Sequence, residues 1–72
     1  MELATIEDLA RLAMEGKIHT IRFASDGRTA VIKYYVGPDN DRMLIEKRIT
    51  PTTGQDGTDK YDVKFLNLKN SC

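Results

Sequence analysis

The 72-residue sequence contains no tryptophan, one cysteine, one histidine and two prolines. Because Cys72 has no second cysteine to pair with, no disulfide can form within the chain, and no Cys/His spacing resembles a zinc site. These absences favour a reducing compartment, so we expect a cytoplasmic protein. We also expect no metal and no cofactor.

The sequence also lacks net charge and long apolar runs. Eleven basic and eleven acidic residues balance, which argues against a bulk electrostatic attraction to nucleic acid or to an anionic membrane. No stretch approaches the roughly 20 apolar residues that span a bilayer, and Met1–Ala4 lacks the basic region and apolar run that open a signal peptide. We therefore expect no membrane association.

What is present fits one small domain over residues 1–72, with a thin core. A helix is predicted from Thr5, the residue type that caps helix N-termini, to Gly16, the type that ends them. The apolar positions of this segment recur at helical spacing, which predicts one buried stripe. They are Ile6, Leu9, Ala10, Leu12 and Ala13.

Asp26-Gly27 stands between two alternating runs and predicts a two-residue type I′ hairpin turn. If Ser25 pairs with Arg28, one side of the ribbon carries the apolar residues and forms the core face. On that face Phe23 pairs with Ala30, Ile21 with Ile32 and His19 with Tyr34. The opposite face is then solvated, and its residues are Ile18, Thr20, Arg22, Val31, Lys33 and Tyr35.

The turn at residues 37–42 preserves this parity in a third strand, so Val36 pairs with Met43 and Ala30 with Ile49. Lys47 then falls on the core face opposite Ile32, and we expect it near an edge, where its stem lies on apolar surface. On the other face, Glu46 falls opposite Lys33 as an ion pair. Pro51 closes the third strand.

Residues 52–59 are predicted to be a mobile polar loop, and residues 61–69 a fourth strand. That strand alternates through Tyr61, Val63 and Phe65 and then changes phase to Leu66 and Leu68, which indicates a β-bulge or a strong bend. We therefore expect an α+β fold in which the N-terminal helix packs on a curved four-stranded antiparallel β-meander (αββββ). A small Sm- or SH3-like barrel is the alternative.

No motif indicates catalysis, so we expect a protein that is not an enzyme. His19, opposite Tyr34, fits a hydrogen-bonded core or boundary residue better than a general base, and a small enzyme using His19 is the least favoured alternative. Asp39 and Asp41, and Asp56 and Asp59, lack the spacing of a calcium loop and fit turns instead.

The solvated sheet face is the candidate binding site. Its members are Arg22, Val31, Lys33, Tyr35, Leu44, Glu46 and Arg48. Ile18, Val31, Tyr35 and Leu44 form an apolar strip ringed by charge, which favours a protein partner. The basic residues around Tyr35 make single-stranded nucleic acid the alternative partner. A homodimer through a strand edge or through this face stays open.

Two partial resemblances exist. The run from Gly16 through Asp26-Gly27-Arg28 resembles the helix-then-hairpin opening of the small head-completion protein of lambdoid phages, in which a second helix follows where strands are predicted here. Ile32-Lys33-Tyr34 with residues 47–51 is similar to part of the Sm-like WYL domains of bacterial and phage regulators, whose arginine-rich segment is missing. Each covers less than half of the chain, so neither assigns a family. Together they suggest a prokaryotic or phage-encoded accessory, regulatory or inhibitor protein.

Overall fold

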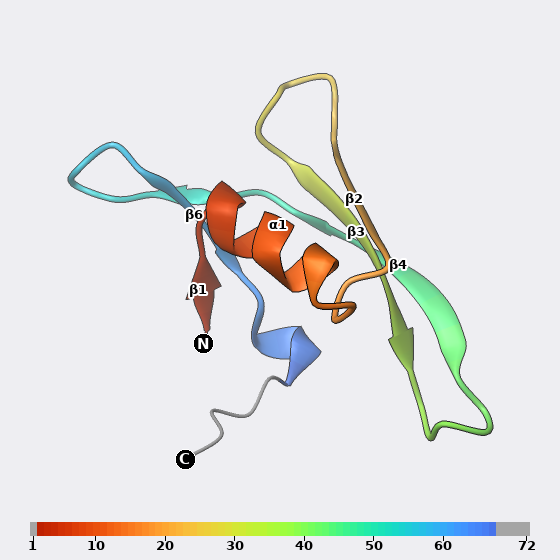
Figure 1. Cartoon of the computed structure of the whole chain (residues 1–72). Coiled ribbons are helices and arrows are strands. Elements are labelled where there is room, and N and C mark those ends of the chain that lie inside the picture. The colour runs from red at the N-terminus through yellow and green to blue at the C-terminus, as the bar shows by residue number, and fades with distance from the viewer. Residues whose placement is uncertain (1, 68–72) are drawn as a thin grey trace, which may run out of the picture.

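The protein, seen in a computed structural model that describes residues 2–67, has one helix and two three-stranded antiparallel sheets. The strand orders are β2-β3-β4 and β1-β6-β5, so the α+β class is confirmed (Figure 1). Leu68 and Lys69, at the end of the predicted fourth strand, and Cys72 lie outside the described residues. The elements are β1 (Leu3–Ala4), α1 (Ile6–Met14), β2 (Thr20–Phe23), β3 (Ala30–Val36), β4 (Met43–Ile49), β5 (Thr52–Thr53), β6 (Asp59–Asp62) and the 3₁₀ helix η1 (Lys64–Leu66).

Helix α1 begins at a capping box. The Asp8 amide donates to the Thr5 hydroxyl at 3.2 Å, and the Thr5 amide donates back to the Asp8 carboxylate at 3.1 Å. The chain leaves the helix at Gly16, whose amide donates to Ala13, while the Lys17 amide donates to Leu12. Both predicted helix ends are confirmed.

The buried stripe of α1 is narrower than predicted. Leu9 and Leu12 are buried and Ala13 is half-buried, whereas Ile6 and Ala10 are exposed. A helix of nine residues turns only one narrow strip toward the sheets. The residues at the margins of the predicted stripe therefore face solvent.

The hairpin between β2 and β3 has the predicted register but not the predicted turn. Phe23 pairs with Ala30 and Ile21 with Ile32. A type I′ turn needs positive φ at both central residues, and only Gly27 has it, at +72°. The chain instead makes a wider loop, which the Asp26 carboxylate holds by accepting the Arg28 and Thr29 amides, both at 2.8 Å.

The loop of residues 37–42 carries the same parity into β4. Val36 pairs with Met43, Ile32 with Lys47 and Ala30 with Ile49, as predicted. Gly37 is required here, because its φ is +101° and a Cβ would lie 2.7 Å from the carbonyl oxygen of Asp41. The two turns together determine which side chains of the sheet face α1.

The four-stranded meander is not formed as predicted, because the chain continues from β4 through Thr50 and Pro51 into β5 of a second sheet. Residues 52–59 are therefore not a free loop. Thr52 pairs with Lys60 across a tight turn at Asp56-Gly57, where Gly57 has a φ of +81°. Over residues 2–67 the two sheets do not close into a barrel.

The predicted phase change near Phe65 is not a bulge. Strand β6 ends at Asp62, whose carboxylate accepts the Lys64 amide at 3.0 Å, and the chain then turns into η1. A 3₁₀ turn has about three residues per turn, so consecutive side chains no longer alternate between opposite faces as they do in a strand. Phe65 and Leu66 consequently both pack, half-buried, against the core.

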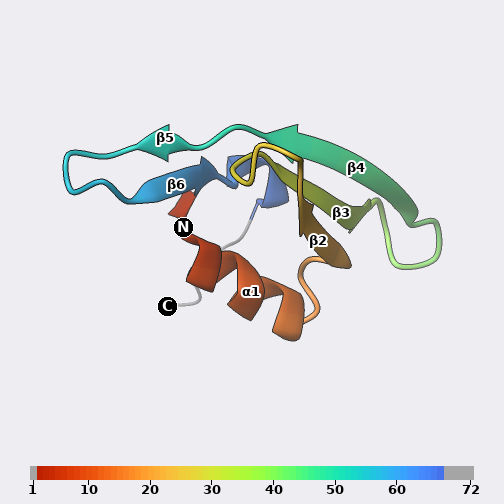
Figure 2. The ribbon, with the colours of Figure 1, turned by 90° about the horizontal axis from the view of Figure 1, so that it is seen from above.

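The core lies between α1 and the sheets. Figure 1 shows α1 and η1 on the same side of β2–β3–β4, and Figure 2 shows α1 lying along one side of both sheets. Ile18, predicted to face solvent, is buried at 1% exposure because it precedes β2 and turns back to the end of α1. The other core residues are Ala4, Leu9, Leu12, Ala30, Ile32, Tyr34, Ile49, Tyr61 and Val63.

Arg28 connects the first hairpin to the second sheet. The buried Tyr61 hydroxyl of β6 donates to the Arg28 carbonyl oxygen at 2.5 Å. The Arg28 guanidinium donates to both carboxylate oxygens of Asp59, at 3.2 and 3.3 Å, and to the Thr53 hydroxyl at 3.0 Å.

The Tyr61 hydroxyl generates a first prediction. Tyr61→Phe leaves the Arg28 carbonyl oxygen without its donor, so we expect the free energy of unfolding in urea to fall by about 1 kcal/mol. Tyr35→Phe, on an exposed ring, is the control and should change it by less than about 0.5 kcal/mol. Equal effects of the two substitutions would show that the Tyr61 hydrogen bond does not stabilise the fold.

Asp26 generates a second prediction. Hydrogen bonds from the Thr29 hydroxyl and from the Arg28 and Thr29 amides lower the pKa of Asp26 from 3.8 to about 2. The unfolded chain then binds more protons between these values, so stability rises with pH through this window and is lost as pH falls toward 2. Asp26→Asn should flatten the fall of the melting temperature between about pH 5 and pH 2. An unchanged slope in Asp26→Asn would contradict this role.

Candidate interaction surface

The seven predicted site residues lie on one face of sheet β2–β3–β4, the face turned away from α1, which we call the outer face. The pairing places Arg22 opposite Val31 and Val31 opposite Arg48. Lys33 lies opposite Glu46, and Tyr35 opposite Leu44. In Figure 1, no described helix or strand covers this face. The structure therefore brings the predicted residues together.

Val31 is on the outer face but is only 1% exposed, so the predicted apolar strip is interrupted. Arg22 and Arg48 are its two cross-strand neighbours, and Arg22 reaches across β3 to within 3.7 Å of the Glu46 carboxylate. The aliphatic stems of long charged side chains cover small neighbours in this way. With Ile18 also in the core, the accessible apolar part of the face is reduced to Tyr35 and Leu44.

Tyr35 and Leu44 form an exposed pair at the end of the outer face nearest the loop of residues 37–42, with 44% and 40% of their surface accessible. The guanidinium carbon of Arg42 lies 4.5 Å from the centre of the Tyr35 ring. The His19 ring packs edge-on to Tyr35, at 5.3 Å between ring centroids. A cation and an imidazole therefore hold the one accessible aromatic ring of this face in place.

The outer face is basic although the whole chain is neutral. Four cations border it and one carboxylate lies among them, that of Glu46, which is paired with Arg22 rather than with its predicted partner Lys33. This gives the face a local excess of positive charge. The cations are Arg22, Lys33, Arg42 and Arg48.

His19 and Arg42 are placed differently from the sequence expectation. His19 is exposed, so its prediction as a core or boundary residue opposite Tyr34 is wrong; it lies just before β2, where the strand has not begun. Arg42 was missed as a site residue because it lies in the predicted turn. The sequence did contain a signal for it. Arg42 directly precedes Met43, and because Met43 pairs with Val36, the predicted register puts Arg42 close to Tyr35.

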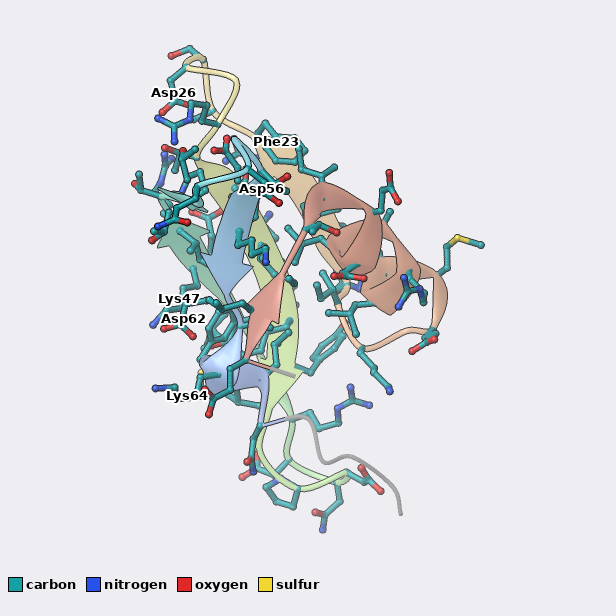
Figure 3. The ribbon with its side chains drawn as sticks, turned by 90° about the vertical axis from the view of Figure 1, so that its left-hand side faces the viewer. Phe23, Asp26, Lys47, Asp56, Asp62 and Lys64 are labelled. Carbon is teal, nitrogen blue, oxygen red and sulfur yellow. The ribbon has the colours of Figure 1, made fainter. Side chains whose placement is uncertain are left out.

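A second basic feature, which we call the basic groove, lies where β4 ends beside β6 and η1. It is an open hollow of about 310 Å³. Lys47 lies on the edge strand β4, as predicted, and its ammonium lies 5.1 Å from the Phe65 ring centroid. Figure 3 shows Lys47, Asp62 and Lys64 near one another at the β4 margin, the edge of the sheet remote from α1. The lining residues are Lys47, Arg48, Ile49, Thr50, Asp62, Lys64 and Phe65.

Two of the aspartates considered as calcium ligands, Asp56 and Asp59, form hydrogen bonds that stabilise the local structure. Asp56 accepts the Thr58 amide at 3.0 Å, and Asp59 holds Arg28 and Thr53. Among residues 2–67, no three His, Cys, Asp or Glu side chains are grouped to hold a metal ion. Within the same range, no helix has the length and apolar character needed to cross a bilayer.

Comparison of the chain with known protein families, with curated proteins and with solved structures finds no match. The two partial resemblances in the sequence therefore receive no support from these comparisons. The outer face and the basic groove are therefore the features of the molecule that suggest a function.

The exposure of the outer face gives a third prediction. Tyr35→Ala and Leu44→Ala, at about 40% exposure, should each lower the free energy of unfolding in urea by less than about 1 kcal/mol. Ile32→Ala, on the other face of the same strand and fully buried, should cost about 2–5 kcal/mol. The reverse order of the three variants would mean that the two faces of the sheet have been exchanged.

Proposed function

We propose that the protein is a non-enzymatic interaction module that binds a protein partner through the outer face. The observation that carries this proposal is the exposed Tyr35–Leu44 pair bordered by cations. An aromatic and an apolar side chain surrounded by charged residues match the centre and rim of a protein interface. Tyrosine and arginine are also the residue types that dominate binding energy at such interfaces.

The charge of the outer face selects the partner chemistry. Arg22, Lys33, Arg42 and Arg48 outnumber Glu46, so the partner should present carboxylates around an apolar spot. Holding the Tyr35 ring against Arg42 and His19 before binding reduces the entropy that association must spend on ordering it. An accessory, regulatory or inhibitor role, in a phage or a prokaryote, is part of the same proposal.

Single-stranded nucleic acid is the second candidate, because four cations surround an aromatic ring. A base that stacks on Tyr35 must share the ring with Arg42, which already lies over it at 4.5 Å. Only one face of one ring then remains for stacking. This geometry favours the protein partner.

Affinity capture from a cell lysate, with quantitative mass spectrometry, tests the proposal. We expect Tyr35→Ala and Leu44→Ala to lower recovery of the same specific protein by about tenfold each, because a central contact is worth about 1–2 kcal/mol. Met14→Ala is the matched control, since Met14 is 88% exposed on α1, away from the outer face. Recovery that is equal for all four proteins contradicts the proposal.

A fluorescence titration with a labelled single-stranded oligonucleotide at low salt distinguishes the second candidate. Binding that weakens with salt and is lost in the double variant Arg22→Ala, Arg48→Ala would favour nucleic acid. No binding at low salt eliminates it.

A further inference from the structure

The outermost strand segments of the two sheets form one open margin. Strand β4 ends the order β2-β3-β4 and β5 ends the order β1-β6-β5, and only Thr50 and Pro51 separate them. Figure 2 shows β4 and β5 along the margin farthest from α1, with no described element beyond them. An open strand edge of this kind can pair with another extended chain.

The hydrogen-bond pattern of the sheet determines which backbone amides and carbonyls of this margin are free to bind another chain. The Ala24 amide donates to Thr29 across the first hairpin, so residues 29, 31 and 33 of the chain turn their backbone groups toward β2. Those of Ala30, Ile32 and Tyr34 then turn toward β4. In β4, every second residue bonds to β3, and the backbone groups of the residues between them point away from β3 and have no hydrogen-bond partner within the described sheet. These residues are Leu44, Glu46 and Arg48, and we call their free amides and carbonyls the β4 edge.

Cations flank the β4 edge on both sides of the sheet. Arg48 projects from the outer face and Lys47 from the opposite one, and Lys47 continues into the basic groove with Lys64. Two carboxylates lie nearby: Glu46 pairs with Arg22, and Asp62, which accepts the Lys64 amide, lines the groove with three cations, Lys47, Arg48 and Lys64. A chain lying along the β4 edge therefore meets an excess of positive charge whichever way its side chains point.

A second copy of the protein fits this edge poorly. The antiparallel register that overlaps the whole of β4 is centred on Glu46, and it places the two Glu46 side chains directly opposite each other. It also sets Leu44 against Arg48. Like charges that face each other across strands are destabilising. The occupant that matches the charge is a different chain.

We propose that the β4 edge, with the basic groove at its end, binds an extended acidic segment of the partner protein as an added β-strand. Its main chain pairs with Leu44, Glu46 and Arg48, and its carboxylates lie against Lys47, Arg48 and Lys64. This proposal rests on the proposed function, that the chain binds a protein, and names the chemistry of the bound segment. It uses the strand edge rather than the Tyr35–Leu44 pair, so the two can fail separately.

The test is an NMR titration of ¹⁵N-labelled protein with a short capped peptide of alternating glutamate and threonine. We expect the amide signals of Leu44, Glu46, Arg48 and Lys64 to shift progressively, with much smaller shifts at the exposed end of α1. The same peptide with glutamine in place of glutamate should bind at least tenfold more weakly, because it lacks the carboxylates. Shifts absent from the β4 edge at millimolar peptide overturn the proposal.

Backbone pairing is tested by a matched pair of variants at Glu46. Glu46→Pro removes an amide that points outward and is tolerated at an edge position, whereas Glu46→Gln keeps the amide. We expect Glu46→Pro to bind the peptide at least tenfold more weakly than Glu46→Gln, because the two variants lose the same carboxylate and only Glu46→Pro loses the amide. Should Glu46→Pro fail to fold, the double variant Lys47→Gln, Lys64→Gln takes its place and should weaken binding of the acidic peptide at least tenfold. Unchanged binding in the variant that folds overturns the proposal.

The same variants separate this proposal from the proposed function when the captured partner is used. If Glu46→Pro loses the partner while Tyr35→Ala keeps it, the edge binds and the outer face does not. If Tyr35→Ala loses the partner while Glu46→Pro keeps it, the proposed function stands and the strand addition is overturned. A concentration-dependent dimer that shifts the edge amides without peptide identifies a second copy as the occupant and also overturns it.

Discussion

The register of the β2–β3–β4 ribbon is the constraint on which the rest of the structure depends. A slip of one residue would exchange the two faces of the sheet, and two local features prevent it. Asp26 holds the first turn through three hydrogen bonds, and Gly37 allows the second at a φ that other residues rarely adopt. Because of these turns, Ile32 and Tyr34 face α1 while Lys33 and Tyr35 face outward.

The division of the strands between two sheets creates the surfaces proposed for binding. A single four-stranded meander would have covered the outer edge of β4 with the fourth strand. Instead, β5 carries the chain past that position, and Arg28 and Tyr61 hold the second sheet against the first hairpin. The β4 edge stays open for this reason. Charged side chains along an open edge hinder aggregation by strand pairing, so a folded protein can keep such an edge.

The sequence predicted the helix, its ends and the register of the first three strands, because capping residues, turn residues and alternation are local signals. It failed where distant segments decide the outcome. Ile18 and Val31 continue the alternation of exposed residues, yet α1 covers one and long side chains cover the other. The Asp56-Gly57 turn carried the same dipeptide as Asp26-Gly27 and could have been recognised. The basic groove could not, because it depends on how η1 meets β4.

Hydrogen exchange of the backbone amides, followed residue by residue, tests the register and the open edge together. We expect slow exchange where β3 and β4 bond to each other, at Ile32, Tyr34, Ile45 and Lys47, and fast exchange at Leu44, Glu46 and Arg48. Slow exchange at the second group with fast exchange at Ile45 and Lys47 would contradict this expectation, because the ladder would then be displaced by one residue.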